Sequence, residues 1–312
     1  MNHWMGVTAL AVTLALGGEA GFAQSVPAKK LFGKVNGPST QTSSSIGGYA
    51  KGCLAGGKML AIDGPAWQAM RLSRNRNWGH PILVNYIEKL AKDSQSVDGW
   101  PGLLVGDLAQ PRGGPMLTGH RSHQIGLDAD IWMIPMPAKR FDASEREKIS
   151  AKSVLAKNKI SVNKTVWQPG HVTLLRRAAS YPGVARIFVH PAIKKELCSA
   201  EQGDKSWLRR VRPWWGHHYH FHVRMSCPLG NKNCVNQKPP PAGHGCGEEL
   251  DKWIARVDPT RKRPKPKKPK VKPKPRRQLT MADLPHSCMN VMGVTAKQLA
   301  ERSVPLPVRK TR

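Results

Sequence analysis

The clearest pattern in the chain is a strict alternation of polar and apolar positions over residues 218–225. His218, His220, His222 and Arg224 occupy every second position. The positions between them are apolar or aromatic: Tyr219, Phe221, Val223 and Met225. Because side chains alternate across a strand, we predict a strand with one core face and one face carrying imidazoles about 7 Å apart. The alternative is a solvent-facing polar strand that happens to contain histidines.

Hydrophobic periodicity predicts further elements on the N-terminal side of this strand. Helices are expected over residues 81–92, about 144–156 and 171–180, and from Pro191 onward, with proline opening the first and the last of these. Strands are expected over residues 103–107, 128–134 and 185–190. Because the elements do not alternate strictly, the pattern predicts an α+β fold with a central antiparallel β-sheet flanked by helices and long loops.

A second group of chemically active side chains lies at the predicted strand 128–134. The segment GHRSHQIGLDAD contains His120, His123, Asp128 and Asp130, with Asp128 and Asp130 on one face of the strand. Two neutral imidazoles and one carboxylate form a zinc site that keeps a fourth position open. The same set suits non-haem iron. An export route and the lack of an obvious cosubstrate site favour zinc, so we expect one Zn²⁺ per chain.

The N-terminal residues are typical of an export signal. Residues 4–16 (WMGVTALAVTLAL) form a short apolar run, and Gly21 and Ala23 fit the −3 and −1 positions of a signal-peptidase site. We expect cleavage after Ala23 and a periplasmic location. A buried apolar N-terminal helix is the alternative. No other stretch is long and apolar enough to predict a transmembrane segment.

Cysteine usage agrees with export. The chain has six cysteines: Cys53, Cys198, Cys227, Cys234, Cys246 and Cys288. An even number in an exported protein predicts three disulfides, and the spacing alone leaves 15 possible pairings. Free or metal-binding thiols are the alternative, but the chain contains no C-x-x-C motif.

The net charge of +30 is distributed unevenly. Residues 261–277 (RKRPKPKKPKVKPKPRR) contain eleven Lys and Arg together with five Pro. Proline and mutual repulsion predict an extended, solvated linker. Export and the lack of interleaved aromatic residues argue against nucleic acid as a partner. Acidic envelope polymers are the better candidate for nonspecific attraction, and a linker without any partner is the alternative. The oligomeric state stays open.

The motifs resemble a known family. His123-x6-Asp130 followed by His220-x-His222 is similar to the zinc signature of the LAS group of metallopeptidases. The match narrows to the penicillin-insensitive murein endopeptidases over residues 38–288. It rests on SIGGYAKGC at 45–53, GHPILV at 79–84, GHRSHQIGLDADIW at 119–132, RIFVHPAIKKELC at 186–198 and WLRRVRPWWGHHYHFHVRMSCP at 207–228.

The resemblance implies specific residues for the site. Zinc would be held by His123, Asp130 and His222. His220 and His217 would lie beside the water that attacks the substrate, with His220 as the first choice for general base and His217 for oxyanion stabilisation, or the reverse. His120 would flank them. The implied disulfides are Cys53–Cys288, Cys198–Cys246 and Cys227–Cys234.

Three features depart from the family pattern. His218 adds an imidazole on the expected metal face, the linker is more basic than the family requires, and the residues after Cys288 match no motif. We therefore divide the chain into a signal peptide (1–23), a metallopeptidase domain (24–258), a basic linker (259–278) and a tail (279–312) anchored by Cys288.

The resemblance implies a zinc endopeptidase that hydrolyses D-alanyl–diaminopimelyl cross-links in peptidoglycan and is insensitive to penicillin. The alternatives are a zinc D-Ala carboxypeptidase acting on stem peptides and a non-catalytic wall-binding protein on the same fold.

Several residues near the motifs allow two interpretations. Asp107 ends a predicted strand and is either a hydrogen-bond partner of the site or a turn former. His80, before Pro81, is expected to cap or pack rather than to catalyse. Trp132, Trp214 and Trp215 border the motifs and either line a substrate groove or pack in the core.

Overall fold

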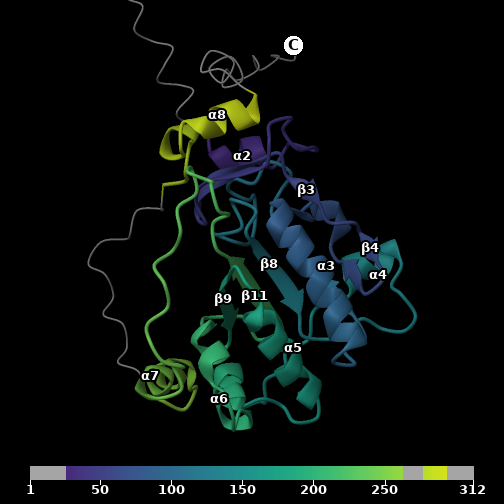
Figure 1. Ribbon diagram of the computed structural model, residues 1–312, viewed down its shortest axis with the longest axis vertical. Helices are drawn as coiled ribbons and strands as arrows, with labels where there is room; N and C mark the ends of the chain where they lie inside the picture. The colour runs from purple at the N-terminus through teal and green to yellow at the C-terminus, as the bar shows by residue number, and fades with distance from the viewer. Residues whose placement is uncertain (1–25, 263–276, 294–312) are drawn as a thin grey trace, which may run out of the picture.

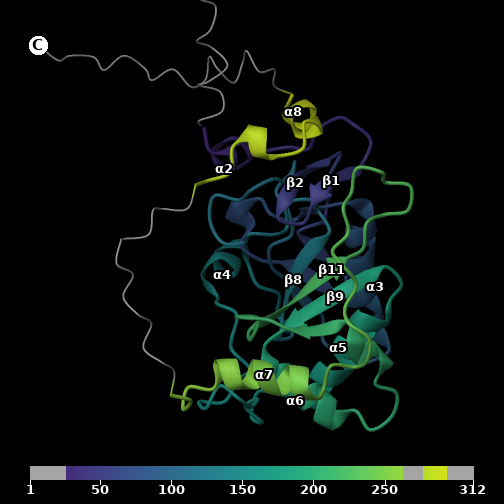
Figure 2. The same cartoon turned by 90° about the vertical axis from the view of Figure 1, so that its left-hand side faces the viewer.

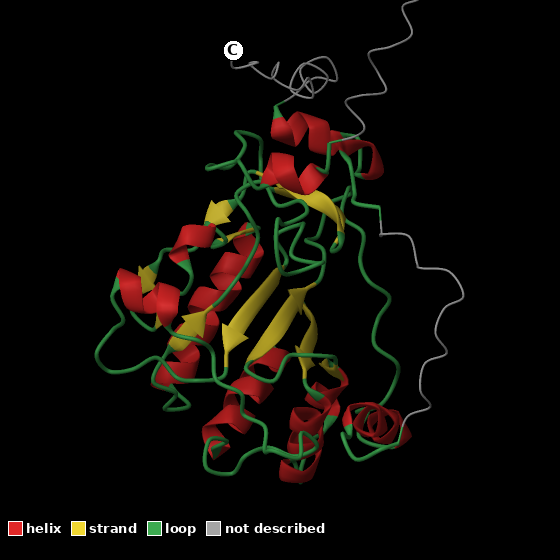
Figure 3. Cartoon of the chain, turned by 180° about the vertical axis from the view of Figure 1, so that it is seen from behind, coloured by secondary structure: helices red, strands yellow, loops and turns green. Residues whose placement is uncertain are grey.

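The computed structural model describes residues 26–262 and 277–293 and is built around one seven-stranded sheet. The strand order is β10-β9-β11-β8-β7-β5-β4. The four inner strands β9, β11, β8 and β7 run antiparallel, while β10 joins β9 and β5 joins β7 in parallel. The predicted α+β class and antiparallel centre are confirmed, with a parallel pair on each side of that centre. Figure 3 shows the strands in the middle of the molecule and helices around them.

The strands of the large sheet are short. Their bounds are β4 Asp63–Gly64, β5 Trp67–Ala69, β7 Leu103–Val105, β8 Asp128–Trp132, β9 Val184–Val189, β10 Val211–Pro213 and β11 His220–Met225. Two further antiparallel pairs lie outside it: β1 Ser44–Gly48 with β2 Lys51–Ala55, and β3 Lys58–Met59 with β6 Trp78–Gly79.

Three helices, α3, α5 and α6, begin at a proline, and α4 begins with a capping box. Their bounds are α2 Ala28–Phe32, α3 Pro81–Ser96, α4 Ala143–Lys148, α5 Pro169–Ser180, α6 Pro191–Ala200, α7 Glu248–Val257 and α8 Ser287–Met292. Short 3₁₀ helices cover Leu72–Arg74, Ser206–Arg209 and Met281–Asp283. As expected, His80 caps a helix: its ring accepts a hydrogen bond from the backbone N–H of Ile82 in α3.

One sheet face forms the main core. Ala129 and Ile131 of β8 and Phe221 and Val223 of β11 are fully buried. They belong to one cluster with apolar residues of α3, α5 and α6, which include Leu83, Ile87, Leu90, Leu174, Ile193 and Leu197. This packing fixes β8 and β11 against the helices and leaves their other face for polar side chains.

A smaller cap lies at one end of the molecule. It combines the β1–β2 hairpin and α2 with α8 from the far end of the chain, as Figures 1 and 2 show. Phe32, Ile46, Met281 and Val291 pack together in its own apolar cluster. The disulfide Cys53–Cys288 joins the two segments across a sequence separation of 235 residues.

The three disulfides are the pairs that the family resemblance implies: Cys53–Cys288, Cys198–Cys246 and Cys227–Cys234. Cys198–Cys246 links α6 to the segment that precedes α7, and the two helices lie at the end opposite the cap in Figure 2. Cys227–Cys234 closes a short loop after β11.

The helix predicted over residues 144–156 is wrong in its second half. A capping box between Asp142 and Glu145 starts α4, but Ile149 is already extended. Val154 is fully buried, and its N–H donates to the carbonyl of His218. Tertiary contacts therefore hold this segment in a non-helical conformation.

Three predicted segments lie wholly or partly outside the described residues. These are the signal peptide, residues 263–276 of the basic linker, and residues 294–312 of the tail. Among residues 26–262 and 277–293, the structure has no helix long and apolar enough to cross a membrane.

Candidate metal centre and active site

Strand register brings the two histidine-rich segments together. His222 of β11 lies opposite Asp130 of β8, and Arg224 lies opposite Asp128. Directly opposed residues on one face have their side chains in contact distance. A one-residue slip of β11 would turn His222 into the core. The apolar residues on the other face, which make any such slip unfavourable, therefore also align the site.

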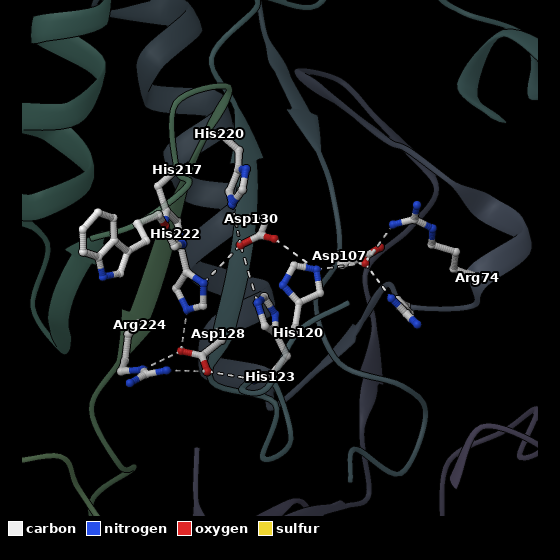
Figure 4. Close-up of polar contacts among 12 residues, drawn as sticks. Arg74, Asp107, His120, His123, Asp128, Asp130, His217, His220, His222 and Arg224 are labelled. Carbon is white, nitrogen blue, oxygen red and sulfur yellow. Dashed lines mark hydrogen bonds and ion pairs between the residues drawn. The ribbon is translucent and has the colours of Figure 1, made fainter. Parts of the chain in front are cut away.

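Asp130 lies at the centre of the site and is almost fully buried. Its carboxylate faces four imidazoles (Figure 4). Oδ1 lies 3.2 Å from Nδ1 of His222 and 3.5 Å from Nε2 of both His123 and His220. Oδ2 lies 3.4 Å from Nε2 of His120. Burial raises the pKa of Asp130, but the surrounding imidazoles bring it well below its usual range.

His123 reaches Asp130 from the loop before β8. Its backbone has a φ of 67°, in the left-handed region that few non-glycine residues adopt. The N–H of His123 donates to Oδ2 of Asp128 at 3.0 Å, which fixes this turn. The ring is fully buried, and burial lowers its pKa to about 4. His123 is therefore neutral at physiological pH and can bind a metal ion without first losing a proton.

Several buried polar atoms at this point have no hydrogen-bond partner. Among the described residues they are both ring nitrogens of His123, Oδ1 of Asp130, and Nε2 of both His220 and His222. Nε2 of His222 lies close to the Asp128 carboxylate but without the geometry of a hydrogen bond. Unpartnered buried polar atoms are costly and uncommon. The ligand atoms of His120, His123 and Asp130 lie within 4.8 Å of one another, so these residues could hold a metal ion. Imidazole and carboxylate donors at this spacing fit zinc chemistry.

Either His120 or His222 could be the third metal ligand beside His123 and Asp130. His222 presents Nδ1 to Asp130, while its Nε2 lies 3.0 Å from Oδ1 of Asp128. The two carboxylates raise its pKa to about 9 despite burial. A ligand imidazole whose other nitrogen meets a carboxylate is the usual arrangement in metal sites. His120 instead shares its Nε2 between Asp130 and Asp107.

Asp128 holds His222 in place. It is fully buried and accepts two bonds from Arg224, from Nε to Oδ1 at 2.7 Å and from Nη2 to Oδ2 at 3.1 Å. The Arg224 guanidinium is itself stacked over Tyr49 and Phe188. Burial raises the pKa of Asp128, but the charges of Arg224 and His222 keep it far below its usual range.

Asp107 organises the side of the site that holds His120. Its Oδ2 accepts from Nη1 of Arg76 at 2.8 Å and of Arg74 at 3.0 Å, and lies 3.1 Å from Nε2 of His120. Burial raises the pKa of Asp107, but these partners bring it down to about 2. Burial lowers the pKa of His120, and the two carboxylates raise it overall. Asp107 is therefore a hydrogen-bond partner of the site.

His217 and His220 lie side by side beyond Asp130, with ring centroids 4.9 Å apart. His217 has a φ of 43°, and its Nδ1 lies 2.6 Å from the carbonyl oxygen of Trp215. Because a carbonyl only accepts, Nδ1 carries the hydrogen. Burial lowers the pKa of His217 to about 3, so its ring is neutral and its Nε2 is an acceptor. Burial also lowers the pKa of His220.

His218 does not share the metal face. The strand β11 begins at His220, two residues later than predicted. The His218 ring lies 6.1 Å from that of His190 and 4.9 Å from that of Tyr219. The predicted row of three imidazoles on one strand is therefore wrong, because the chain bends before β11 begins.

A cavity of about 270 Å³ opens beside Asp130. It is lined by the site and by cationic and aromatic residues that include Arg71, Arg74, His120, Trp132, Tyr219 and His220. Sequence reasoning missed Arg71, Arg74 and Arg76, which come from a segment without any motif, and it gave Arg224 no function. The only sequence feature that pointed to a function for Arg224 was its position on the same strand face as the histidines.

Comparisons with known proteins match nearly the whole described chain. A family model of penicillin-insensitive murein endopeptidases matches residues 45–293. A penicillin-insensitive murein endopeptidase of Haemophilus influenzae is 44% identical over 219 residues, which cover 70% of this chain and 75% of the relative. Proteins with the same description from Pectobacterium atrosepticum and Klebsiella pneumoniae are 38% and 39% identical, covering 84% and 79% of this chain and 90% and 88% of the relatives.

Proposed function

Because the chain belongs to the penicillin-insensitive murein endopeptidase family, we propose that it is an exported zinc endopeptidase of the periplasm that hydrolyses D-alanyl–diaminopimelyl cross-links in peptidoglycan. The observation that carries this proposal is the buried Asp130 carboxylate, which is surrounded by imidazoles and has an oxygen without a hydrogen-bond partner. We further propose that this site lies in an exported domain (24–258). A signal peptide (1–23) precedes this domain, and a linker (259–278) and a tail (279–312) follow it.

We propose His123, Asp130 and His222 as the zinc ligands. Zinc supplies a Lewis acid that polarises the scissile carbonyl and lowers the pKa of a water from ~15.7 toward ~7. His222 is favoured over His120 because Asp128 meets its second nitrogen. Asp107 and Asp128 orient His120 and His222, respectively. Arg71 and Arg74 line the cavity and offer positive charge to the carboxylates of stem peptides.

His217 and His220 would manage the proton and the oxyanion. A general base needs an unprotonated nitrogen, and Nε2 of His217 is one because Nδ1–H donates to the Trp215 carbonyl. Nε2 of His220 lies 3.5 Å from Oδ1 of Asp130 and has no hydrogen-bond partner among the described residues, so an N–H there can donate to a developing oxyanion. We therefore propose His217 as the base and His220 as the donor to the oxyanion. This reverses the first choice from the sequence.

Zinc content separates the two possible third ligands. His222→Ala should reduce zinc from one per chain to none, measured by elemental mass spectrometry. His120→Ala should keep zinc and lose about 10–100-fold in activity, as for the loss of an orienting partner. Zinc retained by His222→Ala and lost by His120→Ala would reverse the ligand assignment.

The reaction is tested with purified cross-linked muropeptide dimers and mass spectrometry of the products. We expect conversion of dimers to monomers that a zinc chelator abolishes and penicillin does not. Loss of only a terminal D-alanine would make the protein a carboxypeptidase. No conversion by the zinc-loaded protein would leave wall binding as the function, with acidic envelope polymers as partners of the basic linker.

A further inference from the structure

Two exposed tryptophans and one half-buried tryptophan form a surface beside the active site. Trp214 and Trp215 lie between β10 and β11 and are 49% and 48% exposed. Their ring centroids lie 5.8 Å and 5.4 Å from that of Trp253 in α7. Clusters of large exposed aromatic side chains are unusual on soluble proteins and mark binding sites. We call Trp214, Trp215 and Trp253 the tryptophan surface.

Contacts of the backbone and of neighbouring residues anchor the segments that carry the tryptophan surface. The N–H of Trp214 donates to the carbonyl of Val189 at 2.8 Å, and the carbonyl of Trp215 accepts from His217. On the other side, Cys246 ties the start of α7 to α6, and Arg212 pairs with Glu249 in the same helix. Rigid aromatic side chains lose little entropy on binding, which suits a preformed ligand site.

The buried ring of Phe188 connects the tryptophan surface with the site residues. The Phe188 ring lies 5.9 Å from Trp214, 6.2 Å from His217 and 5.3 Å from His222. The cationic cavity, by contrast, lies on the side of Asp130 that holds His120 and Arg74. The cationic cavity and the tryptophan surface therefore lie on different sides of the site.

We infer that the tryptophan surface binds the saccharide part of peptidoglycan while the peptide cross-link lies at Asp130. This inference rests on the proposed function. The stem peptide is short and carries carboxylates, which match Arg71 and Arg74 but not indole rings. A pyranose ring has an apolar C–H face, and covering it with an indole removes apolar surface from water on both sides. Saccharide is thus the part of this substrate that the tryptophan surface fits.

The test compares two forms of one cross-linked dimer in the zinc-loaded protein. One carries its disaccharides, and an amidase has removed them from the other. We expect a higher kcat/KM for the disaccharide form. The ratio of kcat/KM for the dimer with disaccharides to kcat/KM for the dimer without them measures this preference. Trp214→Ala and Trp215→Ala should each lower this ratio about tenfold, the scale of losing one aromatic anchor. Trp214→Phe should restore most of the ratio. Leu229→Ala, which removes a fully exposed apolar side chain, is the matched control and should keep it.

Direct binding gives a second readout that needs no catalysis. Titration with chitotetraose should change the tryptophan fluorescence of the zinc-free protein saturably, and Trp214→Ala should weaken this binding about tenfold. Circular dichroism checks that the variants are folded.

Three results would overturn the inference. The first is equal cleavage of both dimers by the wild type together with no saturable chitotetraose binding. The second is an equal loss on both dimers in Trp214→Ala. The third is a wild-type protein that is a homodimer in solution and becomes monomeric in Trp214→Ala. The tryptophan surface would then bind a second copy of the chain. If neither substrate is cleaved but chitotetraose binds, the proposed endopeptidase fails while the saccharide site stands.

Discussion

Asp128 and Asp130 lie two residues apart on the same face of β8, and their surroundings differ sharply. Both oxygens of Asp128 are bonded by Arg224, and one also accepts the N–H of His123. Asp130 has imidazoles around it, but its Oδ1 has no hydrogen-bond partner among the described residues. Asp128 is thus a completed structural ion pair, and Asp130 keeps bonding capacity for a ligand.

The comparison separates stability from chemistry within a few ångströms. A buried carboxylate with satisfied partners contributes to one defined geometry, and removal of its partner is costly. An unsatisfied carboxylate is costly in the folded protein and is kept where it serves function. We therefore expect that substitution of Asp128 lowers the unfolding free energy more than substitution of Asp130. Substitution of Asp130 should lower the activity more than substitution of Asp128.

The largest effect is expected from Asp130→Ala. It should lose zinc and more than about 1,000-fold in kcat/KM, beyond the 100–1,000-fold typical of one lost oxyanion donor. Zinc content and dimer cleavage are the measurements. His123→Ala should behave alike, whereas Asp204→Ala, which removes an exposed carboxylate elsewhere, should change neither. Full zinc and activity in Asp130→Ala would show that the site is assigned wrongly.

Asp128→Asn should cost about 3–5 kcal/mol of unfolding free energy, because it leaves the Arg224 charge without its carboxylate. Asp130→Asn in the zinc-free protein should cost less than this, because it leaves no arginine charge without its carboxylate. Urea unfolding at one pH measures both. The double variant Asp128→Asn/Arg224→Met should recover part of the loss. Equal costs for the two asparagine variants would contradict the comparison.

Variants of His217 and His220 test which of these two residues is the general base. Each should lower kcat/KM about 100–1,000-fold with zinc retained. If His217 is the base, His217→Ala abolishes the acidic limb of the kcat/KM profile against pH, and His220→Ala keeps it. The opposite pattern would restore the assignment expected from the sequence.

The smallest effect concerns Lys194, a buried charge far from Asp128 and Asp130. Its Nζ donates to the carbonyls of Leu208 and His244, and burial lowers its pKa to about 7. Between pH 7 and about 10 the unfolded chain binds the proton that the folded one has lost, so stability rises with pH, by up to about 3 kcal/mol. Urea unfolding at pH 7 and pH 9.5 measures this rise. Lys194→Met should abolish it, and an unchanged slope would place its source elsewhere.

The sequence predicted the elements that follow local rules. Proline at the first position and histidine before it mark α3 and α6, where His80 and His190 cap the helices. The alternation over 220–225 marks β11, because its apolar residues fill the core. The ligand types, and the segments that carry them, followed from the density of histidine and aspartate alone.

Other features depend on contacts that no local pattern encodes. Residues 149–156 leave the helical path because Val154 packs in the core and bonds to the chain beside His218. Arg74 and Arg76 meet Asp107 more than thirty residues later in the chain.

The sequence by itself identified the histidines and aspartates that are candidates for binding a metal and the two segments that carry them. Only the tertiary structure decided that His222 lies opposite Asp130, that Asp128 is taken by Arg224 and that His218 turns away. The physical reason is that strand register and buried charge pairing are set by packing between distant segments. A periodic pattern fixes the face of a side chain but not its partner.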